Sequence, residues 1–355
     1  MDRLTLLTDR IREVLATLPT ASEQWMPEAW KEMVNATALL ALLSSVATVA
    51  PVVNMAVHRP DVSIAPSVLP PPGPSSQGEE IIRQFVNLSR SAEWRLVGKV
   101  KFEGDTFEPE GIVRLSDDRY FVSAVDDINR ASGEGFAHML VFDGKGSRIA
   151  DATITEAGAA EYHVGGIDYD GTFIWATLAQ YRPDSTATLA RIRPDTLQPE
   201  PVLCIEDHMG AAVHDLSNGN ILTLNWGSRR ASVWNLSYKP AVPPACTAPR
   251  AVIKNPSHYT DYQDCKFLGH SQRYGFRPVM LCSGITNLYS TSIGGVALVD
   301  MESMIPLYEV PLTMVSDRGV LVTKNPMDVA IVDGRMRLFF LPDERNSTLY
   351  VYEPA

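Results

Sequence analysis

Side chains capable of acid–base or metal chemistry recur beside one aligned position in five segments of the sequence. The aligned position holds Glu110, Gly165, Gly210, Asp264 and Asp328, and two residues earlier stand Glu108, His163, His208, Tyr262 and Pro326. A histidine beside a carboxylate can transfer protons near neutral pH, and a tyrosine can donate one. Two histidines with a carboxylate also suit a transition metal, whereas carboxylates alone suit calcium. The pattern predicts acid–base chemistry or a cation site, provided that the five segments meet in space.

Each segment has the pattern of two short strands joined by a tight turn. In the clearest copy, His163 and the glycines after it lead through the turn Asp170-Gly171 into a β-branched and aromatic run at 172–177. The aligned positions are 55, 45, 54 and 64 residues apart. Short strands that repeat at this spacing are typical of a β-propeller. We therefore predict an all-β fold of the β-propeller class.

The number of blades follows from the two ends of the repeat region. The last repeat offers only three strands, at 329–332, 337–341 and 348–353, while a strand-like run at 93–102 precedes the first repeat. A propeller joins its ends to remove open sheet edges, so we expect the early strand to complete the last blade. This closure predicts five blades. Six blades remain the alternative, with residues 320–323 as the material for a degenerate sixth.

Inner strands of a propeller begin near the central channel, so the residues at their starts should converge on one mouth. The connections after the second strands should return to the same face, and they carry arginines that suit an anionic group and aromatic rings on which a guanidinium can stack. We expect catalytic roles for His163, His208, Glu110, Asp264 and Tyr262, and substrate-binding roles for Glu108, Tyr181, Arg182, Trp226, Arg229 and Asp328. The alternative for each member is structural, because polar residues at strand starts often bond to backbone groups of a neighbouring blade.

The chain before the propeller divides by composition into three segments. Residues 1–32 form a partly helical extension, 33–57 an apolar segment without charge that resembles a secretory signal, and 58–78 a proline-rich linker, which leaves 79–355 for the propeller. We expect a secreted or lumenal protein. A membrane anchor and a buried apolar segment are the alternatives for 33–57.

The cysteines and glycan acceptor patterns bear on the compartment. Four cysteines, Cys204, Cys246, Cys265 and Cys282, permit three pairings, and a bridge between Cys265 and Cys282 is geometrically feasible on adjacent strands. Free buried cysteines are the alternative. Acceptor patterns at Asn87, Asn235 and Asn346 fit a glycoprotein.

Net charge and composition restrict the partners. The formal net charge of −11, without a basic stripe, argues against nucleic acid. We expect a monomer that takes a small-molecule substrate and meets a membrane only if the apolar segment is retained. The sequence requires no cofactor and leaves room for a divalent metal ion.

Several segments together resemble an uncharacterised β-propeller family of bacteria and filamentous fungi. They are residues 163–171, 181–185, 207–211, 225–229 and 255–265, and the resemblance extends over about 107–352. It implies the fold and no activity. Lactonase and strictosidine-synthase propellers are a looser likeness, and His163 and His208 stand where calcium lactonases use carboxamides, which argues against a calcium-dependent lactonase.

These observations favour an enzyme acting on a small organic metabolite at the central mouth. The chemistry would be hydrolysis of an ester or lactone, or cyclisation in a biosynthetic pathway, with a histidine as base or acid. The alternative is a propeller without catalysis that binds a glycan or protein through its rim.

Overall fold

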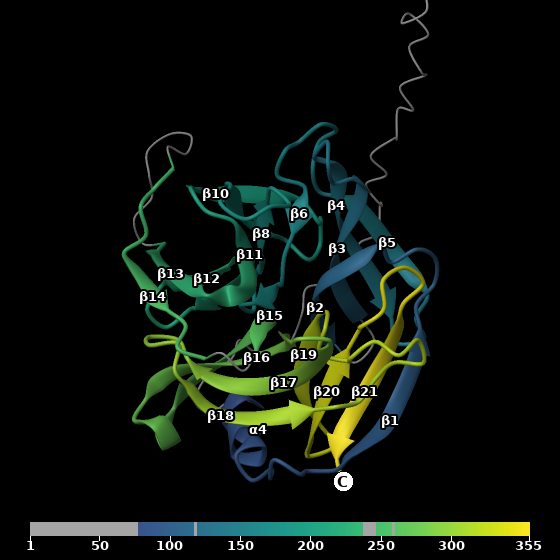
Figure 1. Cartoon of the computed structure of the whole chain (residues 1–355), viewed down its shortest axis with the longest axis vertical. Helices are drawn as coiled ribbons and strands as arrows, with labels where there is room; N and C mark the ends of the chain where they lie inside the picture. The colour runs from purple at the N-terminus through teal and green to yellow at the C-terminus, as the bar shows by residue number, and fades with distance from the viewer. Residues whose placement is uncertain (1–76, 117–118, 237–245, 258–259) are drawn as a thin grey trace, which may run out of the picture. The chain divides into compact units, whose positions relative to one another are not determined.

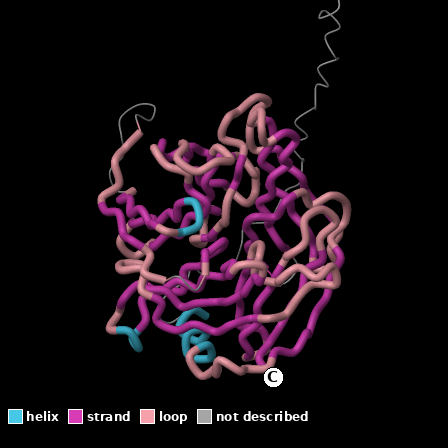
Figure 2. Tube along the Cα trace, viewed as in Figure 1, coloured by secondary structure: helices cyan, strands magenta, loops and turns pink. Residues whose placement is uncertain are grey.

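The computed structural model describes residues 77–116, 119–236, 246–257 and 260–355 (Figure 1). The extension, the signal-like segment and nearly all of the linker that we expect before residue 79 lie outside these residues. Within them, strands dominate, and helix is confined to α4 (Gln77–Phe85) and two single turns, η1 (Trp226–Ser228) and η2 (Gln272–Tyr274) (Figure 2). No helix among the described residues is long and apolar enough to cross a membrane.

Five antiparallel sheets form the blades of a β-propeller, as the repeat predicts. Blade 1 consists of β2 (Glu108–Ser116), β3 (Arg119–Asn129), β4 (Glu134–Asp143) and β5 (Arg148–Thr153). Blade 2 consists of β6 (His163–Val164) and β7 (Asp168–Tyr169), which both pair with β8 (Ile174–Ala179), then β9 (Ala187–Ile192) and β10 (Pro199–Ile205). Blade 3 consists of β11 (Met209–Asp215), β12 (Asn220–Asn225), β13 (Arg230–Asn235) and β14 (Ala251–Lys254). Blade 4 consists of β15 (Asp261–Ser271), β16 (Arg277–Leu288), β17 (Thr291–Asp300) and β18 (Pro306–Leu312).

Blade 5 joins the two ends of the described chain. Its strands β19 (Met327–Val332), β20 (Arg335–Phe340) and β21 (Thr348–Pro354) are completed by β1 (Trp94–Lys101). The early strand β1 pairs with β21 from Trp94 opposite Pro354 to Lys101 opposite Thr348, and the two lie side by side at opposite ends of the colour scale in Figure 1. This pairing confirms five blades closed by an N-terminal strand. Residues 320–323 contribute only an isolated bridge between Val315 and Leu321, so the described residues form no sixth blade.

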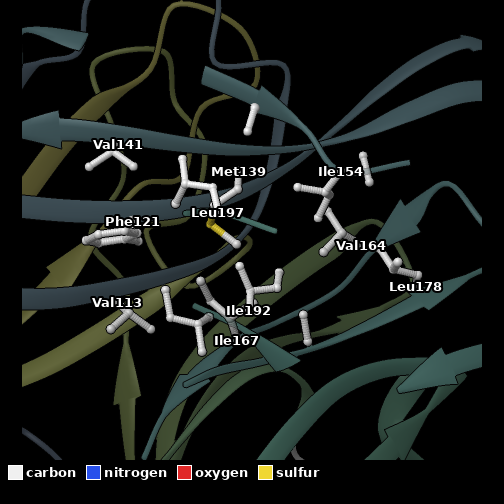
Figure 3. Packing of buried hydrophobic residues seen from close by; sticks show 14 of the residues in the cluster. Val113, Phe121, Met139, Val141, Ile154, Val164, Ile167, Leu178, Ile192 and Leu197 are labelled. Atoms are coloured by element: carbon white, nitrogen blue, oxygen red, sulfur yellow. The ribbon is translucent and has the colours of Figure 1, made fainter. Parts of the chain in front are cut away.

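Apolar side chains fill the spaces between blades. The cluster between blades 1 and 2 includes Phe121, Met139 and Ile192, which are fully buried and interdigitate in Figure 3. Because both faces of a blade are covered by its neighbours, central strands such as β12 and β16 are buried over continuous runs of residues instead of at alternate positions. This packing holds the inner strands, and therefore the residues at their starts, in fixed positions around the channel.

The helix α4 covers the end of the channel opposite the starts of the inner strands. Ile81, Ile82 and Phe85 are buried against blades 4 and 5, and the side chain of Gln84 accepts a hydrogen bond from the amide of Met336. A small cavity of about 120 Å³ remains between α4 and channel residues that include Lys266. The helix therefore leaves the opposite end of the channel as the larger opening.

Blades 2 and 3 approach so closely at Gly165 that a side chain has no room. A Cβ built on Gly165 lies 2.0 Å from the carbonyl oxygen of Gly210. We expect Gly165→Ala to lower the free energy of unfolding by about 1–3 kcal/mol, because the two inner strands must separate. Chemical denaturation measures this. Gly210→Ala is the matched control, since its Cβ meets no atom nearer than 3.8 Å; equal losses in both variants would contradict the explanation.

The four cysteines form two disulfides, Cys204–Cys246 and Cys265–Cys282. Cys265 and Cys282 stand directly opposite each other on β15 and β16, so the bridge that the sequence makes feasible is present. The other bridge fixes the end of β10 to the segment that precedes β14. Together they select one of the three pairings and leave no free cysteine.

Candidate active site at the mouth of the channel

The starts of the inner strands surround one cavity of about 270 Å³. Blades 1 to 4 contribute residues to it, and so does the segment just before β19 of blade 5. The lining includes Glu108, Glu110, His163, Tyr181, His208, Asn225, Trp226, Asp261, Tyr262, Gln263, Lys324 and Asn325. Seven of the eleven residues to which we assign a site role therefore meet here, although up to 154 positions separate them in the sequence.

Glu110 and His163 form the floor of this cavity. Glu108 and Glu110 both line the cavity, although a bulge between Pro109 and Gly111 interrupts the alternation of β2 at Glu110. Oε1 of Glu110 lies 3.6 Å from Nε2 of His163. Burial raises the pKa of Glu110 to about 8 and lowers the pKa of His163 to about 4. At neutral pH the floor therefore holds a protonated carboxyl beside a neutral imidazole, because burial disfavours the charged form of each.

His208 lies beside this pair, just before β11. Its ring centre is 5.2 Å from that of His163, and its Nδ1 lies 2.8 Å from the backbone carbonyl oxygen of Gln180. Since a carbonyl can only accept, Nδ1 carries the proton and Nε2 is left as an acceptor. Burial, together with the neighbouring His163, lowers the pKa of His208 to about 4. The imidazole is therefore neutral at pH 7 and can accept a proton.

Aromatic rings form one wall. Trp226, in η1, packs with its ring centre 4.7 Å from that of His208 and is 40% exposed. Tyr181 lies against His163 at 4.2 Å between ring centres and donates a hydrogen bond of 3.0 Å to Glu108. The guanidinium of Arg130 stacks 3.6 Å from the centre of the Tyr181 ring. The wall is thus held by contacts among residues of blades 1, 2 and 3.

Glu108 is the second carboxyl of the mouth. Burial and the nearby Glu110 raise its pKa, while Arg130 lies 3.6 Å away from its Oε2. Its hydrogen bond from Tyr181 and its ion pair with Arg130 hold Glu108 in the wall. Glu110, in contrast, makes no hydrogen bond to another described residue.

Asp264 and Asp328 lie inside the channel, where they do not line the mouth cavity. Asp264 is fully buried, accepts from the amides of Ile112 and Met327, and pairs with Lys266 at 2.7 Å. Asp328 accepts from the amides of Arg114 and Val329. The geometry fits the structural alternative that we weigh for such residues, since both carboxyls bond to backbone groups of neighbouring strands.

Tyr262 reaches the cavity with its ring, but its hydroxyl is directed elsewhere. Burial raises its pKa to about 12, and the groups that act on the hydroxyl are Ser257, Glu309 and Arg229, none of which lines the mouth. A proton donated from this hydroxyl would therefore have no path to a ligand in the cavity.

The two arginines that we expect to bind an anionic group are placed outside the cavity. Arg229 pairs with Asp261 at 2.6 Å and donates to the carbonyls of Ser257 and Thr260. Arg182 is exposed and bonds to the side chain of Gln180. Both guanidiniums serve the loops that shape the mouth, so the sequence-based reason to expect an anionic ligand is lost.

A family model matches residues 67–355, and its description is "Family of unknown function (DUF6454)". The chain belongs to this family. The match includes every described residue and agrees with the resemblance to an uncharacterised propeller family. A search of curated proteins found no match.

Among solved structures, this DUF6454 protein is similar to several at low identity. A candidate glycoside hydrolase from Parabacteroides distasonis matches with a TM-score of 0.45 and 13% identity, over 72% of this chain and 88% of that one. A DUF4623 family protein from Bacteroides eggerthii matches with a TM-score of 0.41 and 10% identity, over 71% and 59%. Hydrazine synthase from Kuenenia stuttgartiensis matches with a TM-score of 0.36 and 12% identity, over 68% and 58%. Similarity at this level says nothing about activity.

Sequence reasoning missed five polar residues that line the mouth in this DUF6454 member, namely Asn225, Asp261, Gln263, Lys324 and Asn325. Two of them had a usable signal, because Gln263 directly precedes the aligned Asp264 and Asn325 directly precedes Pro326. Asn225 ends β12, so the second strands, as well as the inner ones, deliver residues to the site.

The metal alternative depends on how the donors are arranged. Among the described residues, no group of three or more histidine, cysteine, aspartate or glutamate side chains is arranged to hold a metal ion. His163 and Glu110 are neighbours, and the bond of His208 Nδ1 to the Gln180 carbonyl leaves its Nε2 as an acceptor.

Proposed function

We propose that the protein is an acid–base enzyme that hydrolyses an ester or lactone of a small molecule held in the mouth. One observation carries the proposal: a buried, protonated carboxyl without a hydrogen-bond partner among the described residues shares a cavity with an imidazole whose Nε2 is an acceptor. Environments that separate the pKa values of two groups assign them as acid and base.

His208 and Glu110 divide the proton transfers. Nε2 of His208 takes a proton from a water molecule as the water oxygen attacks the substrate carbonyl carbon. The bond between that carbon and the ester oxygen then breaks, and Glu110 donates its proton to the departing oxygen. The products are a carboxylic acid and an alcohol, and the proton on His208 returns to Glu110 through solvent. His163, next to Glu110, holds the carboxyl in an uncharged environment.

The same two groups support cyclisation as a second reaction class. A nucleophile of the substrate itself would then replace water, with His208 again accepting the proton. We also propose a secreted or lumenal location, which the two disulfides support because such bridges persist in oxidising compartments.

The pH dependence of turnover tests the assignment. We expect kcat/KM for a cleaved lactone or ester to be bell-shaped, rising through about pH 4 as His208 loses its proton and falling through about pH 8 as Glu110 ionises. A pH series on wild type and Glu110→Gln, over a panel of lactones and aryl esters, measures this.

Glu110→Gln should lose the alkaline limb, because glutamine does not ionise, and should retain less activity than wild type. An unchanged alkaline limb would remove Glu110 from the acid role. Binding of panel compounds without turnover by wild type would instead support the rival function, a propeller that binds through its rim.

A further inference from the structure

We propose that the substrate is a neutral, polyhydroxylated molecule of the size of one or two sugar rings. This inference rests on the proposed function for its site and goes beyond it by naming the substrate class. It is carried by the polar groups of the mouth that have no partner in the protein, by the charges around them, and by one exposed ring.

Several polar groups face the cavity without a hydrogen bond to any described residue. The side-chain amide of Gln263 makes none, Asn225 uses only Oδ1, which accepts from the amide of Arg230 at 2.7 Å, and the carboxyl of Glu110 makes none. A ligand that covers these groups would bury them, and buried polar groups in folded proteins nearly always have partners. Amides and a protonated carboxyl both donate and accept, and hydroxyl groups are the ligand groups that can do both in return.

The charges that line the mouth are compensated by the protein itself. Asp261 pairs with Arg229 at 2.6 Å, and Lys324 pairs with Glu344 at 2.5 Å. Glu108 has Arg130 and the hydroxyl of Tyr181. An anionic or cationic ligand would therefore find no unpaired counter-charge among the described residues that line the mouth, while an apolar ligand would leave the amides buried and unpaired.

Trp226 supplies the apolar surface that such a ligand needs. Its indole is partly exposed at the cavity and is fixed by its contact with His208. Sugars carry C–H groups on one face of the ring, which pack on an aromatic ring while their hydroxyls bond elsewhere. A cavity of about 270 Å³ is at the small end of ligand sites, which limits the ligand to one or two rings.

Isothermal titration calorimetry on the purified protein, with defined probes, tests this substrate class. The neutral set contains pentoses, hexoses and their disaccharides, and the matched probes are glucuronate, glucosamine and phenyl acetate. We expect at least one neutral sugar to bind, with glucuronate and glucosamine each weaker by about tenfold. Gln263→Leu and Trp226→Ala should each weaken the binding of that sugar by about three- to tenfold. Gln272→Leu, an exposed glutamine in η2, is the matched control and should bind as wild type does.

The outcomes separate this inference from the proposed function. A sugar that binds through Gln263 and Trp226 supports the substrate class even if no ester or lactone is turned over. Binding of phenyl acetate or a charged probe in preference to every neutral sugar overturns the inference and leaves the acid–base proposal standing. Absence of binding by all neutral sugars up to about 10 mM overturns it as well.

Discussion

Replacing His208 by alanine lowers kcat/KM for the cleaved ester or lactone by about 10²- to 10⁴-fold, the usual contribution of a positioned general base. The imidazole is held in position by its Nδ1–H bond to the Gln180 carbonyl, which leaves Nε2 as the acceptor. Steady-state kinetics of purified wild type and His208→Ala, at the pH of maximal activity, measure the loss. The fold should persist, because five sheets and their apolar contacts do not depend on this side chain.

Matched variants distinguish catalysis from damage to the fold. His270 bonds to Asp215 and the Phe276 carbonyl, away from the mouth, so His270→Gln should keep the wild-type kcat/KM. His163→Ala should lower activity through Glu110, because removal of the ring lets water reach the carboxyl and lowers its pKa; its alkaline limb should move to lower pH. Wild-type kcat/KM in a folded His208→Ala protein would remove this residue from the mechanism.

Replacing Lys266 by methionine lowers the free energy of unfolding at pH 7 by about 3–5 kcal/mol, the loss observed when one partner of a buried ion pair is removed. Lys266 is 5% exposed and Asp264 is fully buried. The ammonium bonds to Asp264 and to the Ile167 carbonyl, and lowers the pKa of Asp168 and Asp328 against the effect of burial. Without it, Asp168, Asp264 and Asp328 share this part of the channel, and Arg114 still lowers the pKa of Asp328. Urea denaturation of both proteins measures the loss.

The loss should depend on pH with a definite sign. Burial raises the pKa of Asp264 to about 7 in the fold, above its ordinary value of 3.8. The folded state therefore binds the proton more tightly than the unfolded state, and loss of the Lys266 ammonium, which lowers this pKa, strengthens that preference. The loss of stability should shrink as the pH falls below 3.8, where the carboxyl becomes protonated in both states. Adding Asp264→Asn to Lys266→Met should restore part of the stability at pH 7, because it removes the uncompensated charge. A further loss in the double variant would contradict this account of the channel.

The fold could be predicted because the sequence contains a repeat of short strands and turns. Two short strands joined by a turn recur in each blade, with glycine at the aligned position in blades 2 and 3, and the run that forms β1 had one incomplete sheet to join. A repeat also places strand starts, which is why the sequence alone groups Glu108, Glu110, His163 and His208.

The aligned positions did not predict how deep in the channel each side chain lies or in which direction it points. β15 begins at Asp261, three residues before the aligned Asp264, so this carboxyl lies at the level of the Ile112 amide, deeper than Glu110. A bulge after Tyr262 interrupts the register there. Charge pairing was equally hidden, since Arg229 meets Asp261 only through the approach of blades 3 and 4. The local pattern predicts roughly where a strand lies in the sequence. Tertiary packing determines its exact start and the residues that its side chains contact.

The proposed mechanism depends most on the protonation states of Glu110 and His208, which can be measured without a substrate. NMR titration of protein labelled with ¹³C at glutamate carboxyls and histidine rings, assigned with Glu110→Gln and His208→Ala, reports both pKa values directly. We expect Glu110 to titrate near pH 8 and His208 near pH 4, so that acid and base coexist in their active forms between these values. A Glu110 carboxyl that titrates near its ordinary value of 4.5, with His208 near 6.5, would contradict it.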